Sequence, residues 1–503
     1  MSAKKKKIQI IGGGFSGLSA ACALASSGCE VTLLEKNSTI GGRARAFHKN
    51  GFMFDMGPSW YWMPDVIENF FSTFGHSTRD YFDLKRLDPS YRIFYDDGPL
   101  DVPASMDELR SMFESLEPGS AARLDAFLTE ARVKYDTGMG RFVWKPSLTM
   151  WEYMHPSLLG KALKLDLFSS VSKHVRKYFR HPKLVDLLEF PVLFLGAQPD
   201  RTPALYTLMN YADLSLGTWY PMGGMVKLPE AIRAMAESLG VTIKTNAPVI
   251  SIVTGGGRVT GTETANGFQP ADAVLAACDY HHVEQKLLKG SERTYNDDYW
   301  HSRTMSPSSM LFYVGINRKI PGLRHHNLFF DEPFGPHAES IYERKDWPER
   351  PRFYACCPSV TDPDVAPEGC ENLFLLIPAA TNLSSDPAQR EVYFKQLIAR
   401  MEKQTGVNIM EHVMFYDSYA HEEFIRDYNA FGGNAYGLAN TLRQTAWMKP
   451  TMKSRKLKNL YFSGQLTVPG PGVPPALISG QLAAQLIRRD CGIPHQPTSP
   501  QLV

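Results

Sequence analysis

Three glycines near the N-terminus have the spacing of a turn that binds the pyrophosphate of a dinucleotide. Gly12, Gly14 and Gly17 follow the apolar run 8–11 and precede the alanine-rich run 18–26. In such a strand, turn and helix, the first glycine makes the turn, the second lets the backbone approach the phosphates, and the third lets helix and strand pack closely. The free N–H groups at the helix start stabilise the phosphate charge. The alternative is a structural glycine turn without a ligand.

An acidic residue stands where such a unit holds the ribose. Glu35 ends a second apolar run, 31–34, and lies 23 positions after Gly12. A carboxylate there accepts hydrogen bonds from ribose hydroxyls and repels a 2′-phosphate. The sequence therefore predicts an adenosine diphosphate group and argues against NADP.

Two further glycine segments favour FAD over NAD. Gly42 and Arg43 follow Glu35 after a short loop, and a forked guanidinium there suits a phosphate. A surface ion pair is the alternative role of Arg43. Residues 52–59 are predicted to form a short strand that ends in a tight turn, with Gly57 where the backbone could approach a flat ring.

The last informative segment lies more than 400 residues further along. A strand is predicted over 459–464, and a proline-glycine run containing Gly470 and Gly472 leads into an apolar helix over 476–488. A helix N-terminus can stabilise the negative charge of a reduced flavin by a few tenths to about 2 kcal/mol. We therefore expect the two distant portions of the chain to meet around one flavin. The alternative is a loop that merely closes the fold.

The elements that must position these residues point to an α/β protein. A chain of 503 residues exceeds the size of a single core. Residues 84–220 are predicted to be mostly helical, with helices over 106–116 and 121–133. Further along, the pattern predicts a helix over 227–239, strands over 241–244, 248–253, 273–277, 310–316 and 372–378, and a hairpin turn at 255–257.

We expect a discontinuous Rossmann-like FAD-binding domain and a substrate domain that combines a mixed sheet with helices. The FAD-binding domain is assigned residues 1–83, 222–302 and 450–503, and the substrate and membrane-binding domain residues 84–221 and 303–449.

Composition excludes several classes of protein. Hydrophobic residues make up 43% and charged residues 21%, which is typical of folded globular chains. The net charge of +2 is too balanced for a protein whose main partner is nucleic acid. Seven cysteines without a C-x-x-C pair indicate a reducing compartment, and the sequence carries neither a secretory signal nor a membrane-spanning run. We expect a cytoplasmic protein.

These motifs resemble the bacterial-type phytoene and carotenoid desaturases within the flavin amine oxidases. The resemblance covers nearly the whole chain, and its most specific part is the closing run from Gly464 to Ser479. It implies non-covalent FAD, a helical substrate lobe, peripheral membrane attachment and desaturation of a C40 polyene. The chain departs from many relatives in residues 59–63 and 432–437, which leaves the number of double bonds and the carotene open.

The motifs and the resemblance together give the predicted FAD contacts, with Val249 contributing its backbone to the adenosine part. They are Gly12, Gly14, Ser16, Gly17, Glu35, Lys36, Gly42, Arg43, Gly57, Pro58, Ser59, Val249, Gly464, Gly470, Gly472 and Val473.

The predicted reaction removes a hydride and a proton from a CH–CH bond, and the flavin takes the hydride. Apolar walls suit this chemistry because water must be excluded. Aromatic residues 60–62 are therefore candidates for substrate contact, although they could equally be core. No catalytic base is assigned, since Tyr153, Asp213 and Tyr436 are supported by location alone, and Asp55 is expected to be structural.

The substrate determines the partner. At about 0.8 kcal/mol per buried CH₂, a C40 chain must be drawn from a bilayer rather than from solution. The segment from Ser157 to Lys183 contains seven basic residues and one acidic residue among many leucines. This favours a basic amphipathic helix on anionic lipid, with an ordinary core-facing helix as the alternative. Oxygen or a quinone is the expected electron acceptor, and the oligomeric state stays open.

Two other functions remain possible on the sequence alone. One is a related flavoenzyme: an amine or protoporphyrinogen oxidase, a hydroxycarotenoid 3,4-desaturase or a terminal-methyl oxidase. The other, least favoured, is a flavin-free prenyl-lipid carrier. No metal site is predicted, because the adjacent pairs His281-His282 and His325-His326 are expected to direct their side chains apart.

Overall fold

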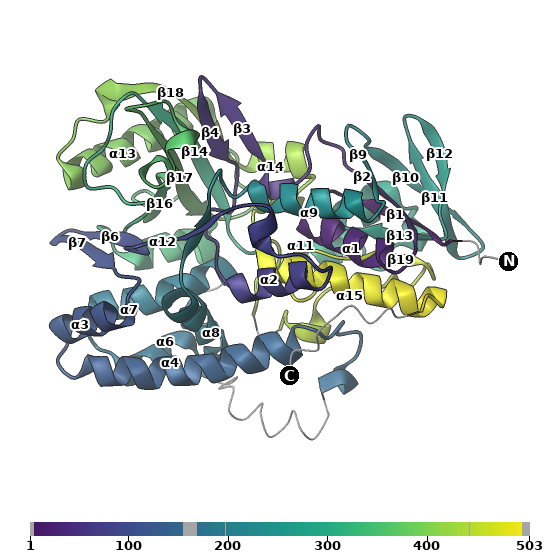
Figure 1. Cartoon of the computed structure of the whole chain (residues 1–503), viewed down its shortest axis with the longest axis horizontal. Coiled ribbons are helices and arrows are strands. Elements are labelled where there is room, and N and C mark those ends of the chain that lie inside the picture. The colour runs from purple at the N-terminus through teal and green to yellow at the C-terminus, as the bar shows by residue number, and fades with distance from the viewer. Residues whose placement is uncertain (1–4, 154–168, 197, 442, 495–503) are drawn as a thin grey trace.

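The structure is a computed structural model that describes residues 5–153, 169–196, 198–441 and 443–494. Two sheets dominate it. Figure 1 shows a parallel sheet with α1, α9 and α15 on the right, a larger sheet with α13 at the upper left, and helices α3, α4, α6 and α7 below that sheet.

The first sheet contains five parallel strands in the order β19-β13-β1-β2-β9. Their bounds are β1 Lys7–Ile11, β2 Glu30–Leu34, β9 Thr242–Lys244, β13 Ala273–Ala276 and β19 Leu460–Phe462. Leu275 pairs with Ile10 on one side and with Tyr461 on the other. Strands distant in sequence therefore share one sheet, with their carboxyl ends at one edge.

Three helices cover this sheet: α1 Phe15–Ala25, α9 Lys227–Ser238 and α15 Val473–Cys491. Helix α1 packs against both α9 and α15. The approach of α1 to α15 is very close, because a Cβ atom at Gly480 would overlap the carbonyl oxygen of Ser16. The hydroxyl of Ser19 also donates a hydrogen bond to the Leu477 carbonyl, at 2.7 Å.

Smaller units complete this half of the molecule. An antiparallel sheet is formed by β10 Val249–Gly255, β11 Arg258–Thr264 and β12 Gly267–Pro270, with a β10–β11 hairpin turn as predicted. The pair β3 Ala46–Lys49 and β4 Phe52–Asp55 follows α1 and β2. Short helices α10 Tyr280–His282 and α11 Asp297–His301 lie after β13.

The second sheet contains seven strands in the order β18-β14-β17-β16-β15-β6-β7, with one parallel pair, β15–β6. The bounds are β6 Tyr91–Tyr95, β7 Gly98–Val102, β14 Ser308–Ile316, β15 His326–Phe329, β16 Phe353–Cys356, β17 Glu371–Ala379 and β18 Val413–Tyr419. Strand β14 is buried at every position. The accompanying helices are α12 Phe334–Glu339, α13 Pro387–Thr405 and α14 His421–Tyr428.

A helical region lies beside the second sheet. It contains α3 Met106–Leu116, α4 Ser120–Thr137, α6 Val171–Tyr178, α7 Pro182–Glu189 and α8 Leu208–Asn210, and α2 Pro64–Ser72 precedes it in the chain. Helix α3 has the predicted bounds. Each of α3 and α6 begins at a serine whose hydroxyl accepts a backbone hydrogen bond, which is a strong helix-start signal.

The prediction that residues 84–220 are mostly helical is wrong for 84–102. Strands β6 and β7 belong to the seven-stranded sheet, and β5 Leu84–Arg86 pairs with β8 Trp219–Pro221. β6 and β7 pair with each other as a local hairpin. β6 also pairs with β15 far along the chain, where Asn327 lies opposite Arg92, and this pairing places the hairpin in the sheet. Among the described residues, no helix combines the length and apolarity needed to cross a membrane.

Candidate functional site

The glycine turn between β1 and α1 is sterically tight at two of its three predicted glycines, and the contact of Gly14 with a pyrophosphate stays a prediction. Gly12 has a φ of +108°, and a Cβ there would lie 2.9 Å from the Ala277 carbonyl oxygen. A Cβ at Gly17 would overlap the carbonyl oxygen of Gly12. Gly14, in contrast, caps α1 and has space around it, since the nearest atom to an added Cβ would be 3.9 Å away. Steric fit thus requires Gly12 and Gly17, while Gly14 leaves the helix N-terminus accessible.

The second glycine pair packs directly on this turn. The Gly41 N–H donates to the Gly13 carbonyl at 2.8 Å, and a Cβ at Gly42 would lie 3.2 Å from Gly14 Cα. A Cβ at Gly57 would overlap the carbonyl oxygen of Arg43. Three predicted cofactor segments are therefore stacked against one another at the carboxyl end of β1.

Glu35 is buried beside the same turn and holds it in place. One carboxylate oxygen accepts the Gly13 N–H at 2.7 Å, and the other accepts both the backbone and the side-chain N–H of Asn37, at 2.8 and 2.9 Å. The Glu35 carbonyl accepts the Ala247 N–H, which brings the segment before Val249 next to it. A contact of Glu35 or Val249 with a ribose stays a prediction.

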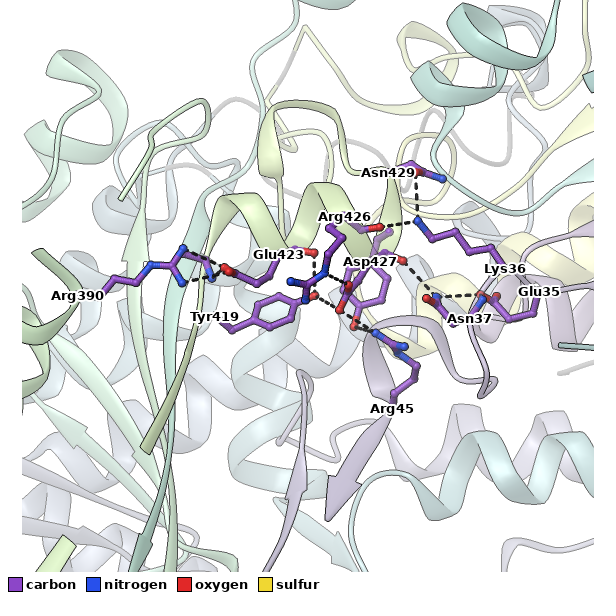
Figure 2. A network of polar contacts seen from close by, with 12 residues as sticks. Glu35, Lys36, Asn37, Arg45, Arg390, Tyr419, Glu423, Arg426, Asp427 and Asn429 are labelled. Carbon is purple, nitrogen blue, oxygen red and sulfur yellow. Dashed lines mark hydrogen bonds and ion pairs between the residues drawn. The ribbon is translucent and has the colours of Figure 1, made fainter. Parts of the chain in front are cut away.

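Lys36 lies in a polar network that joins this region to α14 (Figure 2). Its ammonium donates to the Arg426 carbonyl at 2.6 Å and to the Asn429 side chain at 3.1 Å. In the same network, Asp427 accepts hydrogen bonds from Arg45 and from the Tyr419 hydroxyl, each at 3.1 Å. Two hydrogen bonds of the Lys36 ammonium therefore go to α14 and the residue that follows it, so a contact with a cofactor would have to use its third N–H.

Arg43 is largely buried and only partly satisfied. Its Nη2 donates to the Asn434 carbonyl at 3.0 Å, and its guanidinium lies over the ring of Tyr428. Across the parts of the chain that the structure describes, its Nε has no hydrogen-bond partner and the side chain forms no ion pair. The alternative role of Arg43 as half of a surface ion pair is therefore not seen here.

The closing segment contacts the opening one. A Cβ at Gly464 would lie 3.4 Å from the Ser16 hydroxyl, and the Gly464 N–H donates to Ser479 in α15 at 2.9 Å. Gly470 and Gly472 have φ values of +135° and +113°, and Gly472 caps α15 at Val473. Both helix N-termini therefore lie at the carboxyl edge of the parallel sheet, which is where such sheets bind ligands.

Ser59 connects the Gly57-Pro58 turn to a buried cluster. Its hydroxyl accepts a hydrogen bond from the Tyr354 hydroxyl at 2.9 Å, and Tyr354 lies 2.6 Å from His326 Nδ1. The prediction that His325 and His326 diverge is wrong: their rings lie 4.5 Å apart, and both reach Cys356. Burial lowers the pKa of His325 to about 3, so this imidazole stays neutral.

Aromatic side chains surround this cluster. Trp60 stacks on His326 with 4.0 Å between ring centroids and also contacts Trp62 and Tyr91. Tyr91 donates its hydroxyl to Asp213 at 2.8 Å, and burial raises the pKa of Asp213 to about 7. The apolar wall predicted beside the Gly57 turn is therefore present, and it contains a carboxyl group that titrates near neutrality.

Several residues of the site carry no local sequence signal. Lys449 and Asn440 lie against Gly470, and Tyr354 reaches Ser59 from β16. Each comes from a segment far from the glycine motif it contacts. A lysine before a proline, as in Lys449-Pro450, has no distinctive pattern, so only the three-dimensional arrangement identifies these residues.

Comparison with known proteins gives a consistent picture. The family of flavin containing amine oxidoreductases matches residues 15–488. A carotenoid 3,4-desaturase of Haloarcula japonica is 41% identical over 488 residues, covering 96% of this chain and 98% of the relative. A zeta-carotene-forming phytoene desaturase of Myxococcus xanthus is 31% identical and covers 96% and 94%. A crystal structure of an oxidoreductase from Methanosarcina mazei matches with a TM-score of 0.61 at 15% identity, covering 95% of this chain and all of that one, which supports the fold alone.

Proposed function

This chain belongs to the flavin containing amine oxidoreductases, among the carotenoid desaturases, and we propose that it uses FAD to introduce double bonds into a C40 carotenoid. The observation that carries the proposal is the 41% identity over the full length to a carotenoid 3,4-desaturase. The expectation of a flavin-dependent oxidoreductase agrees with this family membership. The protein's exact substrate and product are the parts that remain proposals.

The residues at the carboxyl edge of the parallel sheet fit FAD. The open N-terminus of α1 at Gly14 suits a pyrophosphate. Arg43 has a buried Nε near this edge with no partner among the residues that the structure describes, available for a phosphate or a ring oxygen. When bound, FAD would supply the hydride-accepting chemistry that the protein side chains lack.

The choice of bond is narrowed by the degree of similarity. Identity is 41% to the carotenoid 3,4-desaturase and 31% to the phytoene desaturase. We therefore favour 3,4-desaturation of a carotenoid. Phytoene desaturation toward neurosporene or lycopene, which the motifs suggest, is the second candidate. A zeta-carotene-forming phytoene desaturase at 31% identity and a 4,4'-diapophytoene desaturase at 30% support this type of reaction.

The protein's own contribution to the reaction is orientation and exclusion of water. Trp60, Trp62 and Tyr91 form an apolar wall next to the Gly57 turn. Such a wall would hold a polyene and keep water away from a developing positive charge. Asp213 lies behind Tyr91, with its carboxylate oxygens hydrogen-bonded to the hydroxyls of Tyr91 and Thr218. It therefore orients this wall rather than facing a substrate directly.

The carotenoid is proposed to come from a membrane surface. Residues 157–168 of the predicted basic helix lie outside the described residues. In the remainder, α6 directs Val171 and Val175 into the protein core, while Lys173, Lys177 and Arg180 are exposed. This helix would therefore supply charge rather than apolar contact. Trp151, 74% exposed, and Met150 lie just before the basic segment and would supply the apolar contact.

Product analysis tests the reaction. The purified flavoprotein is incubated in liposomes with phytoene, lycopene or a hydroxylated acyclic carotene, under oxygen or with a quinone, and products are separated by chromatography. We expect a red-shifted product that is two hydrogens lighter from lycopene or its hydroxylated form. Conversion of phytoene alone would favour the second candidate. Bound flavin without conversion of any carotenoid would refute desaturation.

Vesicle binding tests the membrane proposal separately. A triple charge reversal of Lys173, Lys177 and Arg180 to glutamate is compared with the same reversal at Arg258, Lys286 and Lys289, which are exposed elsewhere. We expect the first variant to lose most co-sedimentation with anionic vesicles and the second to retain it. Equal binding by both variants would contradict a contact through α6.

A further inference from the structure

Lys449 is a buried lysine with no counter-charge in the part of the chain that the structure describes. The residue is only 4% exposed. Its Nζ has no hydrogen-bond partner among the described residues. Burial alone lowers the pKa of its ammonium to about 7, with no carboxylate opposing the shift. Most buried lysines are paired with an acceptor or a counter-charge. Because the described residues supply neither to Lys449, a bound ligand is the natural source of its partner.

The position of Lys449 links it to the flavin-facing turn. A Cβ at Gly470 would lie 2.5 Å from the Lys449 Nζ, so the ammonium occupies the space that a side chain at 470 would fill. The same Cβ would lie 3.3 Å from the side-chain oxygen of Asn440, which is also buried and unpartnered among the described residues. Two residues after Gly470, Gly472 caps α15, a helix of 19 residues.

Three features therefore converge on one small region: an ammonium, an amide oxygen and the positive end of a long helix. A buried charge without a counter-charge is unfavourable. The cost is offset when an acceptor atom of a ligand enters within hydrogen-bond distance, and both the helix N-terminus and the ammonium favour a negatively charged acceptor. The unpartnered Asn440 oxygen can in turn accept from an N–H of the same ligand.

We propose that Lys449 is a positioning residue for the flavin: with Asn440 and the N-terminus of α15 it receives an electronegative edge of the cofactor and stabilises its reduced, negatively charged form. This inference rests on the proposed function, because it requires FAD at this edge of the sheet. Lys449 forms no covalent bond and transfers no electron. FAD, when bound, would accept a hydride, which carries two electrons and one proton, and the ammonium of Lys449 would stabilise the negative charge that this leaves on the cofactor.

The midpoint potential of the bound flavin is the direct test. Lys449→Met removes the charge and keeps an unbranched chain of similar length, Lys449→Arg keeps the charge, and Lys453→Met is the control. Lys453 is four residues away and pairs with Asp490 at the surface. For Lys449→Met we expect flavin reduction at pH 7 to become at least tenfold less favourable, a fall of about 30 mV for a two-electron couple. Lys449→Arg should stay within threefold of the wild type, and Lys453→Met should not differ from it.

Thermal stability separates this role from a purely structural one. In flavin-free protein, Lys449→Met removes an unpaired buried charge, so its Tm should rise above that of the wild type. The increase in Tm on adding FAD should be smaller in the variant, because a ligand stabilises by its affinity for the folded state. A merely structural lysine would instead lower Tm in both states.

Two results would overturn the inference. One is a Lys449→Met protein that binds flavin at the wild-type potential. The other is a Lys449→Met protein that loses flavin affinity or Tm while the Lys449→Arg protein loses equally. Failure of the proposed function looks different: the wild-type protein itself would then bind no FAD, or would bind FAD and convert no carotenoid, whatever the Lys449 variants show.

Discussion

Replacing Gly480 with alanine tests whether the opening and closing portions of the chain must touch. Gly480 lies on α15 where that helix meets α1. An added Cβ would overlap the carbonyl oxygen of Ser16 and would lie 2.9 Å from both the Ala20 nitrogen and the Ser19 Cβ. Most of these neighbours are backbone atoms, which cannot turn aside as a flexible side chain could.

The size of the effect follows from this geometry. To restore ordinary van der Waals contact, the two helices must separate by about 1 Å. Overpacking of this kind costs about 1–3 kcal/mol, and rigid backbone on one side favours the upper value. Alanine favours the helical conformation over glycine by roughly 1 kcal/mol, and this gain offsets part of the cost. We therefore expect Gly480→Ala to destabilise the protein by about 2 kcal/mol.

The assay compares Tm and FAD affinity with those of a matched control, Gly290→Ala. The control makes the same substitution at a position where an added Cβ would have no atom within 4 Å. Gly480→Ala should lower both Tm and FAD affinity, because displacement of α15 moves Gly472 away from the α1 turn. Gly290→Ala should leave both unchanged. A Gly480→Ala protein with wild-type Tm and affinity would refute the close approach and the reasoning built on it.

Three further substitutions probe buried polar groups. Tyr354→Phe should cost about 1–3 kcal/mol in denaturant unfolding, because it removes the hydroxyl that lies 2.6 Å from His326 Nδ1; an unchanged midpoint would contradict that contact. Arg45→Met should lower the free energy of unfolding by about 2 kcal/mol, because it removes the Arg45 hydrogen bond to the partly buried Asp427. The loss is no larger because Asp427 keeps its hydrogen bonds from other residues. A loss no greater than that for an exposed arginine would argue against the network. Burial raises the pKa of Asp55 to about 7 in the folded protein, whereas the pKa in the unfolded chain is about 3.9. Between these two pH values the carboxyl group carries a proton in the folded state that it has lost in the unfolded state. Its contribution to stability is therefore greatest at low pH and falls as pH rises toward 7. Asp55→Asn should gain Tm relative to the wild type between pH 5 and 7, whereas a constant difference would exclude this titration.

Local patterns predicted the regular elements well. The strand, turn and helix around Gly12 and Gly17 depend on residues adjacent in sequence, and the structure has β1 and α1 there. Helix α3 begins after Ser105, whose hydroxyl accepts the Glu108 N–H, so its start is encoded within four residues. The two long strands β14 and β17 are equally evident, because their continuous apolar runs, 310–314 and 373–377, are typical of buried strands.

Contacts between distant segments could not be predicted in this way. Strand β6 forms a local hairpin with β7, but its place in the seven-stranded sheet depends on Asn327 and Phe329 of β15, and neither lies near it in sequence. Lys449 has no distinguishing neighbour, and only its position against Gly470 indicates a role. The His325, His326 and Cys356 cluster likewise forms because β15 and β16 run antiparallel, which pairs His326 with Cys356. In each case the deciding interaction is tertiary.

The strand order of the parallel sheet has a consequence for biosynthesis. β1 occupies the centre, yet β13 and β19, which complete one side of the sheet, are translated more than 260 and about 450 residues later. During synthesis, β1 is therefore without its full set of neighbouring strands until nearly the whole polypeptide has left the ribosome. Contacts of such large sequence separation form slowly. A product truncated before β19 would lack one strand of this sheet and the whole of α15, and we expect it to enter degradation rather than accumulate.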